Sequence, residues 1–425
     1  MYIRKLSLLN FKNIAQADLT LREGINCFTG RNGAGKTNVI DAVWYLSMCK
    51  SALTMTDGQS IRHGEEFFLL SGDYTADDGR HETVTCSFRR GNGKVLKRNG
   101  KEYERLSDHI GMIPAVIVSP ADSFLVSDAA DERRKWLNAF ISQHDRDYLN
   151  ALIRYNRALA ERNRLLKQLQ SPQQGELLEV FDMQLAAHGR TIHAARAAAV
   201  RELRPIVEEY YRIISGDREQ VSLDYRSELN DTEPEALLEA SRARDIANQF
   251  TTSGVHRDDM VMKIGGYPLR KYGSQGQQKS FLIALKLAQY AIVAEEKHER
   301  PVLLLDDLFD KLDAGRVEQL IRLVSSETFG QILISDCNPT RLKAILDRSG
   351  GDYALFSVAD GAITQERKTA RQLEEEAQTG ETKTAKETAG IGAEAGEAGI
   401  ANESGNQPAR EETAAGMQST ETDEP

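Results

Sequence analysis

Eight residues near the start of the chain have the types and spacing of a loop that binds nucleotide phosphates. The segment GRNGAGKT fits the pattern G-x-x-x-x-G-K-[ST], in which glycines let backbone N–H groups point inward at the phosphates. In this pattern Lys36 reaches the β- and γ-phosphates, and the hydroxyl of Thr37 binds Mg²⁺. We therefore predict a site for ATP and Mg²⁺, with Lys36 also contributing to catalysis. The predicted cofactor-binding residues of this loop are Gly30, Arg31, Asn32, Gly33, Ala34, Gly35, Lys36 and Thr37.

A second segment, VLLLDD, ends in two carboxylates that would complete such a site. A buried strand here would bring Asp306 to the metal, so that Thr37 and Asp306 together bind Mg²⁺. Asp307, one residue further on, would polarise the attacking water as the catalytic carboxylate. Because many strands end in acidic residues, this segment is informative only together with the phosphate loop.

A third segment, KYGSQGQQKS, is a polar loop that runs directly into an apolar helix. Free backbone N–H groups and the helix dipole at such a helix start attract an anion. Ser274, Gly276 and Gln277 resemble the signature motif of ABC-type ATPases, and DDLFDKLD resembles the acidic pair and the D-loop of that class, ending at Asp313. These four residues are predicted to contact the nucleotide. The alternative interpretation is a polar helix cap without a ligand.

The elements around these motifs alternate between short strands and helices, which is typical of an α/β fold. GINCFTG reads as a strand before the phosphate loop, and NVIDAVWYLS has helical apolar spacing after it. Turns such as DDG and RNG between residues 67 and 103 indicate antiparallel hairpins. A helix over 276–294 precedes the apolar strands PVLLLDD and GQILISD, and YALFSVADGAI reads as a closing hairpin. We expect a mixed sheet with antiparallel hairpins.

Residues 131–250 interrupt this pattern with long helical segments. Alternating spacings of three and four predict a heptad seam formed by Leu149, Leu152, Asn156, Leu159, Asn163 and Leu166. After the break SPQQG, a second helix has one face that contains Phe181, Leu185, His188, Ile192, Ala195 and Ala199. We predict an antiparallel helical hairpin, an arm whose legs of about 25 residues would span roughly 40 Å. The alternative is an ordinary helical bundle.

The composition separates the end of the chain from the rest. The 425 residues carry a net charge of −10, but residues 368–425 contain 13 acidic and 5 basic residues, which leaves −2 for residues 1–367. This tail is rich in Glu, Ala, Gly and Thr, so it cannot bury a core and is expected to be disordered. We predict an ATPase head over 1–130 and 251–365, a helical arm over 131–250 and a tail over 366–425.

The cysteines and the apolar runs favour a cytoplasmic protein. Cys27, Cys49, Cys86 and Cys337 are widely separated and form no CxxC pair, which argues against a zinc site or a disulfide framework. The N-terminal segment lacks the apolar run of a signal peptide, and no stretch approaches the roughly 18 apolar residues of a membrane span. We expect a reduced compartment and no membrane partner.

As far as about residue 365, the sequence resembles the RecF family, bacterial recombination-repair ATPases related to the SMC proteins. The matching stretches are LSLLNFKNI, FTGRNGAGKTNVIDAVWYLS, SPADSFLVSDAADERRKWLN, YLNALIRYNRALAERNRLLK, FDMQLAAHGRTI, GVHRDDMVMKIGGYPLRKYGSQGQQKS and VLLLDDLFDKLD. The resemblance implies an ABC-type ATPase head with an inserted helical hairpin arm. Lys12, Asn138 and Val255 stand where the family pattern has Arg, Asp and Pro.

Two further departures concern catalysis. Many ABC-type ATPases have Glu where this chain has Asp307, and the shorter side chain puts fast hydrolysis in doubt. No histidine follows the strand ILISD, so the usual γ-phosphate switch residue is missing, and Ser335 or Asp336 would have to replace it. The resemblance implies that the signature of one subunit contacts the γ-phosphate held by the other. ATP binding would then close a homodimer on DNA, and hydrolysis would release it.

The resemblance also implies partners. RecF-like proteins are expected to recognise the duplex beside single-strand gaps, and to act with RecR and RecO in placing RecA on gapped DNA, with a weak, DNA-stimulated ATPase activity. The best candidate for the DNA contact is a hairpin that carries Arg89, Arg90, Lys94, Lys97, Arg98 and Lys101, and the resemblance rather than the charge supports this assignment. A second basic set, on the arm, is Arg154, Arg157, Arg162, Arg164 and Lys167. Ordinary solvated surface is the alternative for both sets.

His256, Arg257 and Asp258 match a RecF motif without an evident physical role, and a hydrogen-bonded core histidine is one interpretation of His256. Three other functions stay open. An SMC-type structural ATPase would need arms of hundreds of residues, whereas only about 120 are available here. An ABC transporter subunit would need no helical arm. A DNA-binding scaffold that uses ATP only as an assembly signal is compatible with Asp307.

Overall fold

The structure, a computed structural model, describes residues 1–127, 130–168, 172–309, 312–326, 328–348 and 352–367. These residues belong to one compact unit that spans residues 1–369. The tail predicted over 366–425 lies outside the described residues, apart from residues 366 and 367 at the end of a strand. In the described part of the chain, no helix is both long and apolar enough to cross a membrane.

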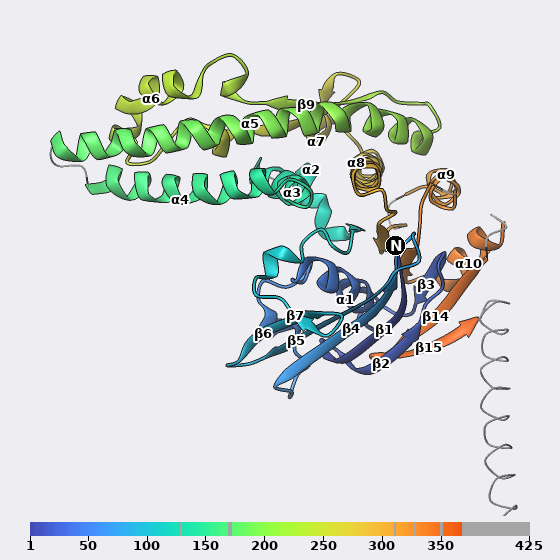
Figure 1. The fold of residues 1–425 in the computed structure, drawn as a ribbon. Coiled ribbons are helices and arrows are strands. Elements are labelled where there is room, and N and C mark those ends of the chain that lie inside the picture. The colour runs from blue at the N-terminus through green and yellow to red at the C-terminus, as the bar shows by residue number, and fades with distance from the viewer. Residues whose placement is uncertain (128–129, 169–171, 310–311, 327, 349–351, 368–425) are drawn as a thin grey trace, which may run out of the picture. The chain divides into compact units, whose positions relative to one another are not determined.

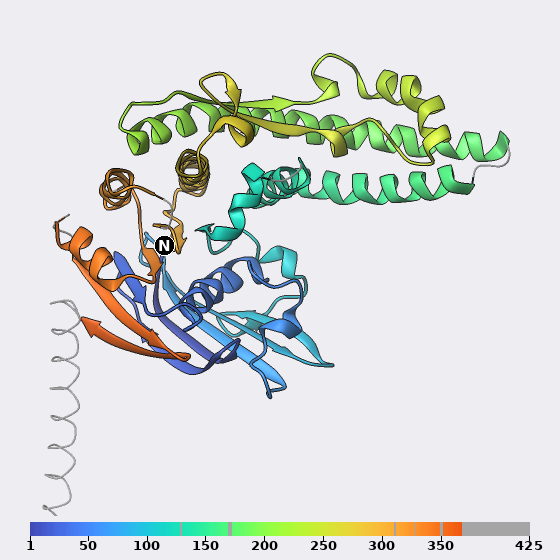
Figure 2. The same ribbon diagram turned by 180° about the vertical axis from the view of Figure 1, so that it is seen from behind.

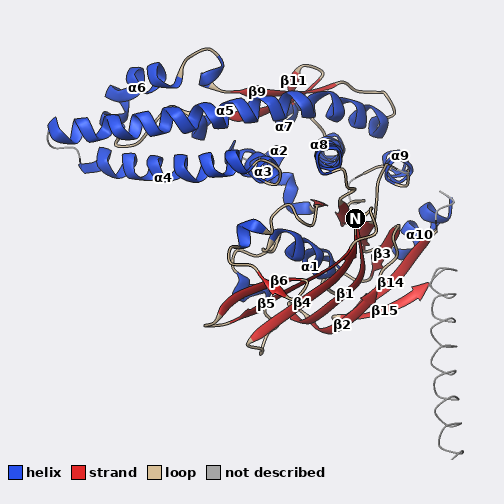
Figure 3. Ribbon diagram, viewed as in Figure 1, coloured by secondary structure: helices blue, strands red, loops and turns tan. Residues whose placement is uncertain are grey.

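A six-stranded antiparallel sheet contains the hairpins that the turn motifs predict (Figure 3). Its order is β2-β1-β4-β5-β6-β7, and β4 alternates buried with half-buried side chains. The turn between β6 and β7 is formed by Asn99 and Gly100, both at positive φ (51° and 78°), as a tight hairpin requires. The strands are β1 (Tyr2–Phe11), β2 (Ile14–Thr20), β4 (Phe67–Thr75), β5 (His81–Arg89), β6 (Gly93–Arg98) and β7 (Lys101–Glu102).

A second six-stranded sheet, of order β15-β14-β3-β13-β12-β8, is mainly parallel. Its parallel strands are apolar toward both faces because other elements cover each face. The antiparallel pair β14–β15 is the predicted closing hairpin. The strands are β3 (Ile25–Thr29), β8 (Ala115–Val118), β12 (Val302–Asp306), β13 (Ile332–Asp336), β14 (Tyr353–Ala359) and β15 (Ala362–Arg367).

Helices cover both faces of the parallel sheet, and β12 shows how the two cores divide. Leu304 packs in the core shared with α1 and the antiparallel sheet, whereas Leu303 and Leu305 pack in the core shared with α8, α9 and α10. The carboxyl ends of its strands therefore lie next to the helices that follow these strands in the chain. The helices are α1 (Lys36–Met48), α8 (Gln275–Lys297), α9 (Ala314–Val324) and α10 (Pro339–Arg348).

Residues 131–250 contain the predicted helical hairpin. Helices α4 and α5 lie side by side and run in opposite directions (Figures 1 and 2). α5 has 44 residues and is much longer than the roughly 25 predicted. The division into head and arm at residues 131 and 250 stays a prediction. The remaining helices are α2 (Phe124–Ser127), α3 (Ala130–Ser142), α4 (Arg146–Gln168), α5 (Pro172–Ser215), α6 (Pro234–Asn248), α7 (Leu269–Tyr272), and the short η1 (Asp57–Ser60), η2 (Leu106–Asp108), η3 (Pro120–Ser123), η4 (Glu228–Asn230) and η5 (Val255–Arg257).

A small antiparallel sheet beside α5 was missed by the sequence interpretation of this region as mainly helical. Strand β9 pairs with β10, and β10 pairs with β11. The segment VSLDYR is short, and its partner strand begins 33 residues after it ends, so local spacing gives little signal for it. The strands are β9 (Val221–Arg226), β10 (Asp259–Ile264) and β11 (Tyr267–Pro268).

The buried seam of α4 is displaced by one residue from the predicted seam, which is therefore wrong in register. Asn156 is exposed, and of the predicted positions only Leu166 is fully buried. The prediction failed because tyrosines, alanines and an arginine occupy the buried stripe. These residues are Tyr148, Ala151, Tyr155, Ala158, Arg162 and Leu165. The predicted face of α5 is confirmed, since Leu185, Ile192 and Ala199 are buried there.

Arg162, which the sequence interpretation placed among possible DNA contacts, is fully buried between α4, α5 and α6. Its Nε donates to Asp182 Oδ1 at 2.6 Å. Its Nη1 donates to Asp245 Oδ2 at 2.7 Å and to Thr251 Oγ1 at 2.8 Å. A side chain with these partners cannot reach DNA, so that assignment is wrong. The arginine instead holds the helices of this region together.

An Arg162→Ala protein is expected to lose about 3–5 kcal/mol of unfolding free energy, because the fully buried carboxylate of Asp245 would lose its cation. Arg164, on the same helix but 71% exposed, provides the matched control. Arg164→Ala should change the unfolding free energy by no more than about 0.5 kcal/mol. Urea unfolding of both proteins measures the difference. Equal losses would show that the buried ion pairs are not what stabilises this region.

Candidate nucleotide-binding site

The phosphate loop joins the end of β3 to the start of α1, as predicted. Two of its glycines are required by the backbone. A Cβ atom on Gly30 would lie 2.1 Å from the carbonyl oxygen of Val358, and Gly35, the residue before α1, has a φ of +117°. Any larger residue at these positions would displace the loop, so its shape depends on them.

Two side chains hold the loop from inside and outside. Lys36 Nζ donates to the carbonyl oxygens of Gly30 at 2.8 Å and Arg31 at 3.0 Å, so the ammonium group lies within the curve of the loop. Asn13 Nδ2 donates to the carbonyl oxygen of Ala34 at 3.0 Å. The prediction of site residues did not include Asn13, although it belongs to the stretch LSLLNFKNI that carries the family resemblance. Its distance of 21 residues from Ala34 hid the contact.

Lys12, where the family pattern has Arg, places a cation beside α1, the helix that follows the phosphate loop. Its Nζ lies 2.6 Å from Oδ2 of Asp41, which is buried on α1. The same carboxylate accepts from Ser51 Oγ at 2.7 Å. The lysine therefore forms an ion pair that anchors α1 beside the first strand.

The carboxylate pair at the end of β12 is connected to the phosphate loop. Thr37 Oγ1 donates to Asp306 Oδ1 at 2.9 Å, and Ser335 Oγ donates to the same oxygen at 2.6 Å. Burial raises the pKa of Asp306, and the two hydrogen bonds oppose that rise. The structure thus brings together the two residues predicted to bind Mg²⁺. Their hard oxygen atoms are the donors that Mg²⁺ prefers.

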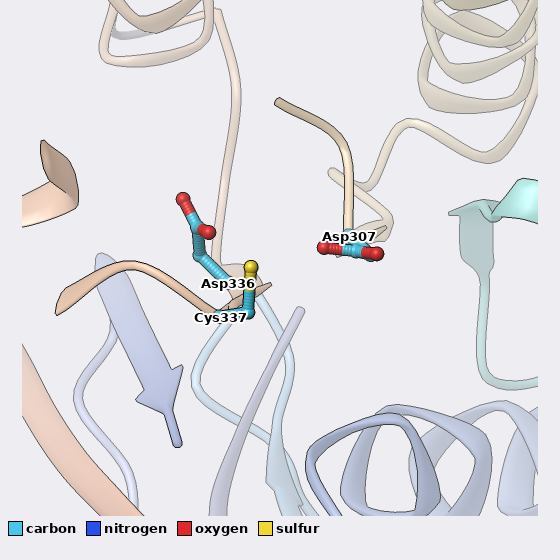
Figure 4. Close-up of side chains that lie close together, drawn as sticks. All are labelled: Asp307, Asp336 and Cys337. Carbon is cyan, nitrogen blue, oxygen red and sulfur yellow. The ribbon is translucent and has the colours of Figure 1, made fainter. Parts of the chain in front are cut away.

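Asp307 follows in the left-handed region of the backbone, with a φ of +46°. Its N–H donates to Ser335 Oγ at 3.0 Å. Figure 4 shows its carboxylate facing Asp336 and Cys337, and one ligand atom from each of the three residues lies within 4.8 Å of the others. The carboxylate of Asp307 therefore lies beside the end of β13.

Of the two residues suggested to replace the missing switch histidine, the geometry favours Asp336. Both side chains are buried, but the hydroxyl of Ser335 is occupied by Asp306 and by the N–H of Asp307. Asp336 lies beside Asp307, and both of its carboxylate oxygens accept from Arg341 Nη2 at 3.1 Å. The role itself stays a prediction.

All four cysteines are free thiols, and Cys337 alone among them is exposed.

The signature segment caps the start of α8. Ser274 Oγ accepts from Gln277 N at 3.3 Å, while Gln277 Oε1 accepts from Ser274 N at 2.7 Å, which is a reciprocal capping box. Ser274 is exposed. The alternative interpretation as a helix cap is thus correct as a description of the local structure. It leaves the hydroxyl at a surface where a helix N-terminus attracts an anion.

Asp313 forms the equivalent cap of α9. Its carboxylate accepts from the N–H of Arg316 at 2.9 Å and from Arg316 Nε at 3.2 Å. The hydrogen bond from the Arg316 N–H is the main reason that the pKa of Asp313 is lowered. Arg316 also reaches Glu219, and Glu219 in turn accepts from Gln277. The signature and the D-loop are therefore connected, although neither connection was predicted.

The basic hairpin predicted to contact DNA divides into two groups. Arg98 is paired with Glu82 through Nε at 2.9 Å and Nη2 at 2.6 Å. Lys94 lies 2.9 Å from Asp57 Oδ1 and is only 12% exposed. These partners neutralise both cations, so neither is suited to bind phosphate. The other four, which are exposed, are Arg89, Arg90, Lys97 and Lys101.

The VHRDD segment has a structural role. His256 Nε2 donates to the carbonyl oxygen of Thr251 at 3.0 Å, which leaves Nδ1 to accept from the Tyr155 hydroxyl at 2.9 Å. Burial lowers the pKa of His256 to about 4, so the ring is neutral. Asp258 pairs with the buried Arg196 at 3.2 Å. The interpretation of His256 as a hydrogen-bonded core histidine is confirmed.

Asn138, where the family pattern has Asp, belongs to the same network. Its Oδ1 accepts from Arg196 Nη2 at 2.9 Å and from the Tyr148 hydroxyl at 2.6 Å. Val255, where the pattern has Pro, supplies a carbonyl oxygen to Arg196 Nη1 at 2.7 Å. In this chain both residues provide acceptors for the same arginine.

Comparisons with known proteins agree with this geometry. The profile of the RecF/RecN/SMC N terminal domain matches residues 2–351. The DNA replication and repair protein RecF of Bacteroides thetaiotaomicron is 46% identical over 365 residues, which cover 86% of this chain and 99% of the relative. A solved structure of the recombination mediator protein RecF with ATP, from the RecFOR pathway, is 30% identical with a TM-score of 0.76, covering 86% of this chain and 98% of that one.

The head domain of Smc from Pyrococcus furiosus, with an extended coiled coil, has the same fold at 16% identity, with a TM-score of 0.54 over 89% of this chain and 99% of that one. The predicted fold, an ABC-type ATPase head with helical extensions, is thereby confirmed. The matched domain, the curated relative and the ATP-bound structure all point to one family. The chain belongs to the RecF family of DNA replication and repair proteins.

Proposed function

We propose that this chain binds Mg²⁺ and ATP and that ATP closes two copies of it into a dimer on DNA. The observation that carries the proposal is the connected set of Lys36, Thr37 and Asp306 at the ends of two parallel strands, with exposed Ser274 capping a separate helix. In the dimer, the signature of one copy contacts the γ-phosphate bound by the other. Association is then coupled to the nucleotide state.

The residues present suit the proposed ligands. The N–H groups of the loop between Gly30 and Thr37 would hold the phosphates, and Lys36 would balance their charge. Thr37 and Asp306 would hold Mg²⁺, which would neutralise charge that develops on the phosphate oxygens. The oxygen of water would attack the γ-phosphorus while the bond between that phosphorus and the ADP oxygen breaks. Asp307 would accept the proton that the water loses. Because Asp is shorter than Glu, we propose that hydrolysis is slow.

The proposed DNA is duplex beside a single-strand gap, where the protein would act with RecO and RecR in placing RecA. The relatives support this: the curated ones are named as DNA replication and repair proteins, and a solved one belongs to the RecFOR pathway. A cytoplasmic location follows from such a function. An ABC transporter subunit and an SMC-type structural ATPase are disfavoured by identity with RecF proteins over most of the chain.

A gel-shift assay on gapped duplex DNA tests the function. The DNA should be retained with ATP or a non-hydrolysable analogue and released with ADP, because only a γ-phosphate can bridge two copies. We further expect the four exposed hairpin cations, Arg89, Arg90, Lys97 and Lys101, to contact phosphates. Replacing all four with Ala should lower DNA affinity by about tenfold or more near 0.1 M salt and reduce the slope of log K against log salt.

The control for this experiment replaces exposed cations elsewhere on the chain with Ala. Suitable positions are Arg4, Lys135, Arg322 and Lys343. This protein has the same net charge as the hairpin variant, so a general electrostatic effect would weaken both equally. Equal weakening would place the DNA surface elsewhere. Equal retention of DNA with ADP and with ATP would contradict the nucleotide-dependent clamp itself.

A further inference from the structure

Glu219 lies between α5 and β9, and three elements meet at its carboxylate. Its Oε1 accepts from Gln277 Nε2 in the signature segment at 3.0 Å and from Arg316 Nη2 on α9 at 2.9 Å. Its Oε2 accepts from the hydroxyl of Tyr211, one turn before the end of α5. The side chain is only 20% exposed. A single acidic group therefore joins the long helix to both of the segments that cap α8 and α9.

Each partner of Oε1 holds a segment that faces the second copy in the proposed dimer. Gln277 accepts from Ser274 N at 2.7 Å and so fixes the cap of α8. Arg316 donates to Asp313 through N and Nε, and its Nη1 donates to Ser280 Oγ on α8 at 2.7 Å. Both caps are thus held by groups that also bind the same carboxylate.

The contacts depend on the negative charge of Glu219. Burial alone would raise its pKa, but hydrogen bonds from Tyr211 and Gln277 and the charge of Arg316 lower the pKa below its usual value. An amide at this position has one acceptor oxygen and an NH₂ group, whereas all three neighbours donate. It would leave at least one donor unpaired, and it would remove the less exposed of the two carboxylates, Glu219 and Asp313, that pair with the mostly buried Arg316.

We propose that Glu219 is a positioning residue that sets the signature and the D-loop together and connects them, through Tyr211, to the long helix α5. This role of Glu219 rests on the proposed ATP-dependent dimer and concerns how the nucleotide site of that dimer is regulated. A displacement of the end of α5, such as DNA binding would impose on the arm, would be transmitted to both dimer-facing caps. By linkage, closure of the dimer would equally bias the position of α5.

The test uses the full chain with Glu219→Gln. Its affinity for ATP as a monomer should stay within about twofold of the wild type, because the phosphate loop is untouched. Its dimer dissociation constant with Mg²⁺ and ATP should rise about tenfold or more, measured by sedimentation. Glu209→Gln is the matched control, because Glu209 is also near the end of α5 but is exposed, and its ion-pair partner among the described residues is Arg212 on its own helix. It should dimerise like the wild type.

The link to α5 is tested by Tyr211→Phe, which removes one hydroxyl from a fully buried ring. Dimerisation should weaken about threefold, whereas Tyr210→Phe, whose ring packs near Phe329, should have no effect. The double variant Glu219→Gln/Tyr211→Phe should be no weaker than Glu219→Gln alone, because the hydroxyl acts through the carboxylate. Independent, additive losses would overturn the connection.

The failure of this inference can be separated from failure of the proposed function. If the wild type dimerises with ATP and Glu219→Gln dimerises equally well, the positioning role is wrong and the clamp stands. If Glu219→Gln loses ATP affinity and thermal stability together with dimerisation, Glu219 is a general structural residue and the inference is also overturned. If the wild type stays monomeric with Mg²⁺ and ATP, both proposals fall.

Discussion

A Ser274→Arg protein should bind ATP as tightly as the wild type and yet remain monomeric in its presence. Lys36, Thr37 and Asp306 are unaltered by the change, so nucleotide affinity is preserved. In the proposed dimer, however, the hydroxyl of Ser274 lies against the γ-phosphate of the other copy. A long side chain at the exposed start of α8 would keep the two surfaces apart. Equilibrium binding of a fluorescent ATP analogue and sedimentation with Mg²⁺ and ATP measure the two properties separately.

The control is Ser274→Ala, which removes the cap without adding bulk. It should cost about 1 kcal/mol of stability and weaken dimerisation less than the arginine does. If Ser274→Arg instead loses nucleotide binding, the signature belongs to the site of its own chain. The two-copy interpretation would then be wrong, although the phosphate loop would remain the nucleotide site.

Mixing two inactive proteins sharpens the same prediction. Lys36→Ala lacks a functional phosphate loop, and Ser274→Arg lacks a functional signature, so neither can build a complete site with itself. A mixed dimer contains one complete site, which is formed by the loop of the Ser274→Arg copy and the signature of the Lys36→Ala copy. In this mixed dimer the arginine faces the loop of the Lys36→Ala copy, which holds no nucleotide and so leaves room for the long side chain. Dimers should therefore reappear on mixing. No recovery from a mixture of two folded proteins would contradict a site that is shared across copies.

The features that the sequence predicts well are those whose residues are contiguous. The phosphate loop, the acidic pair and the α8 cap each depend on a few neighbouring residues, and the structure has each in the predicted element. Backbone requirements such as the positive φ of Gly35 are visible in a single sequence because only glycine meets them readily. For the same reason the RNG turn correctly placed a hairpin at Asn99 and Gly100.

The features that it misses depend on partners far away in the chain. Arg162 looks like a surface cation because Asp182 and Asp245, which neutralise it, lie 20 and 83 residues later. Arg98 looks free because Glu82 faces it from the neighbouring strand. The predicted seam of α4 was displaced by one residue because the buried stripe consists of tyrosines, alanines and an arginine as well as leucines. Glu219 carried no signal at all, since its importance comes only from the three elements that converge on it.

Asp307→Asn is expected to separate ATP binding from ATP hydrolysis. Asn tolerates the left-handed backbone that Asp307 adopts, with a φ of +46°, so the turn after β12 should be kept. The amide cannot accept a proton from water. Hydrolysis should therefore fall about 100-fold or more, the lower end of what a general base contributes, whereas ATP affinity should change little. Phosphate release measures the rate, and Asp306→Asn, which should weaken Mg²⁺ and ATP binding as well, is the contrasting variant.

The oligomeric state of Asp307→Asn decides between two uses of ATP. If hydrolysis releases the clamp, this protein should form a dimer on gapped DNA that outlasts that of the wild type, because its γ-phosphate persists between the copies. A monomeric Asp307→Asn protein with bound ATP would contradict the shared site. A dimer with an unchanged lifetime would mean that dissociation does not require hydrolysis. ATP would then act only as a signal for assembly. The short side chain of Asp307 would be consistent with a protein that does not depend on rapid ATP hydrolysis.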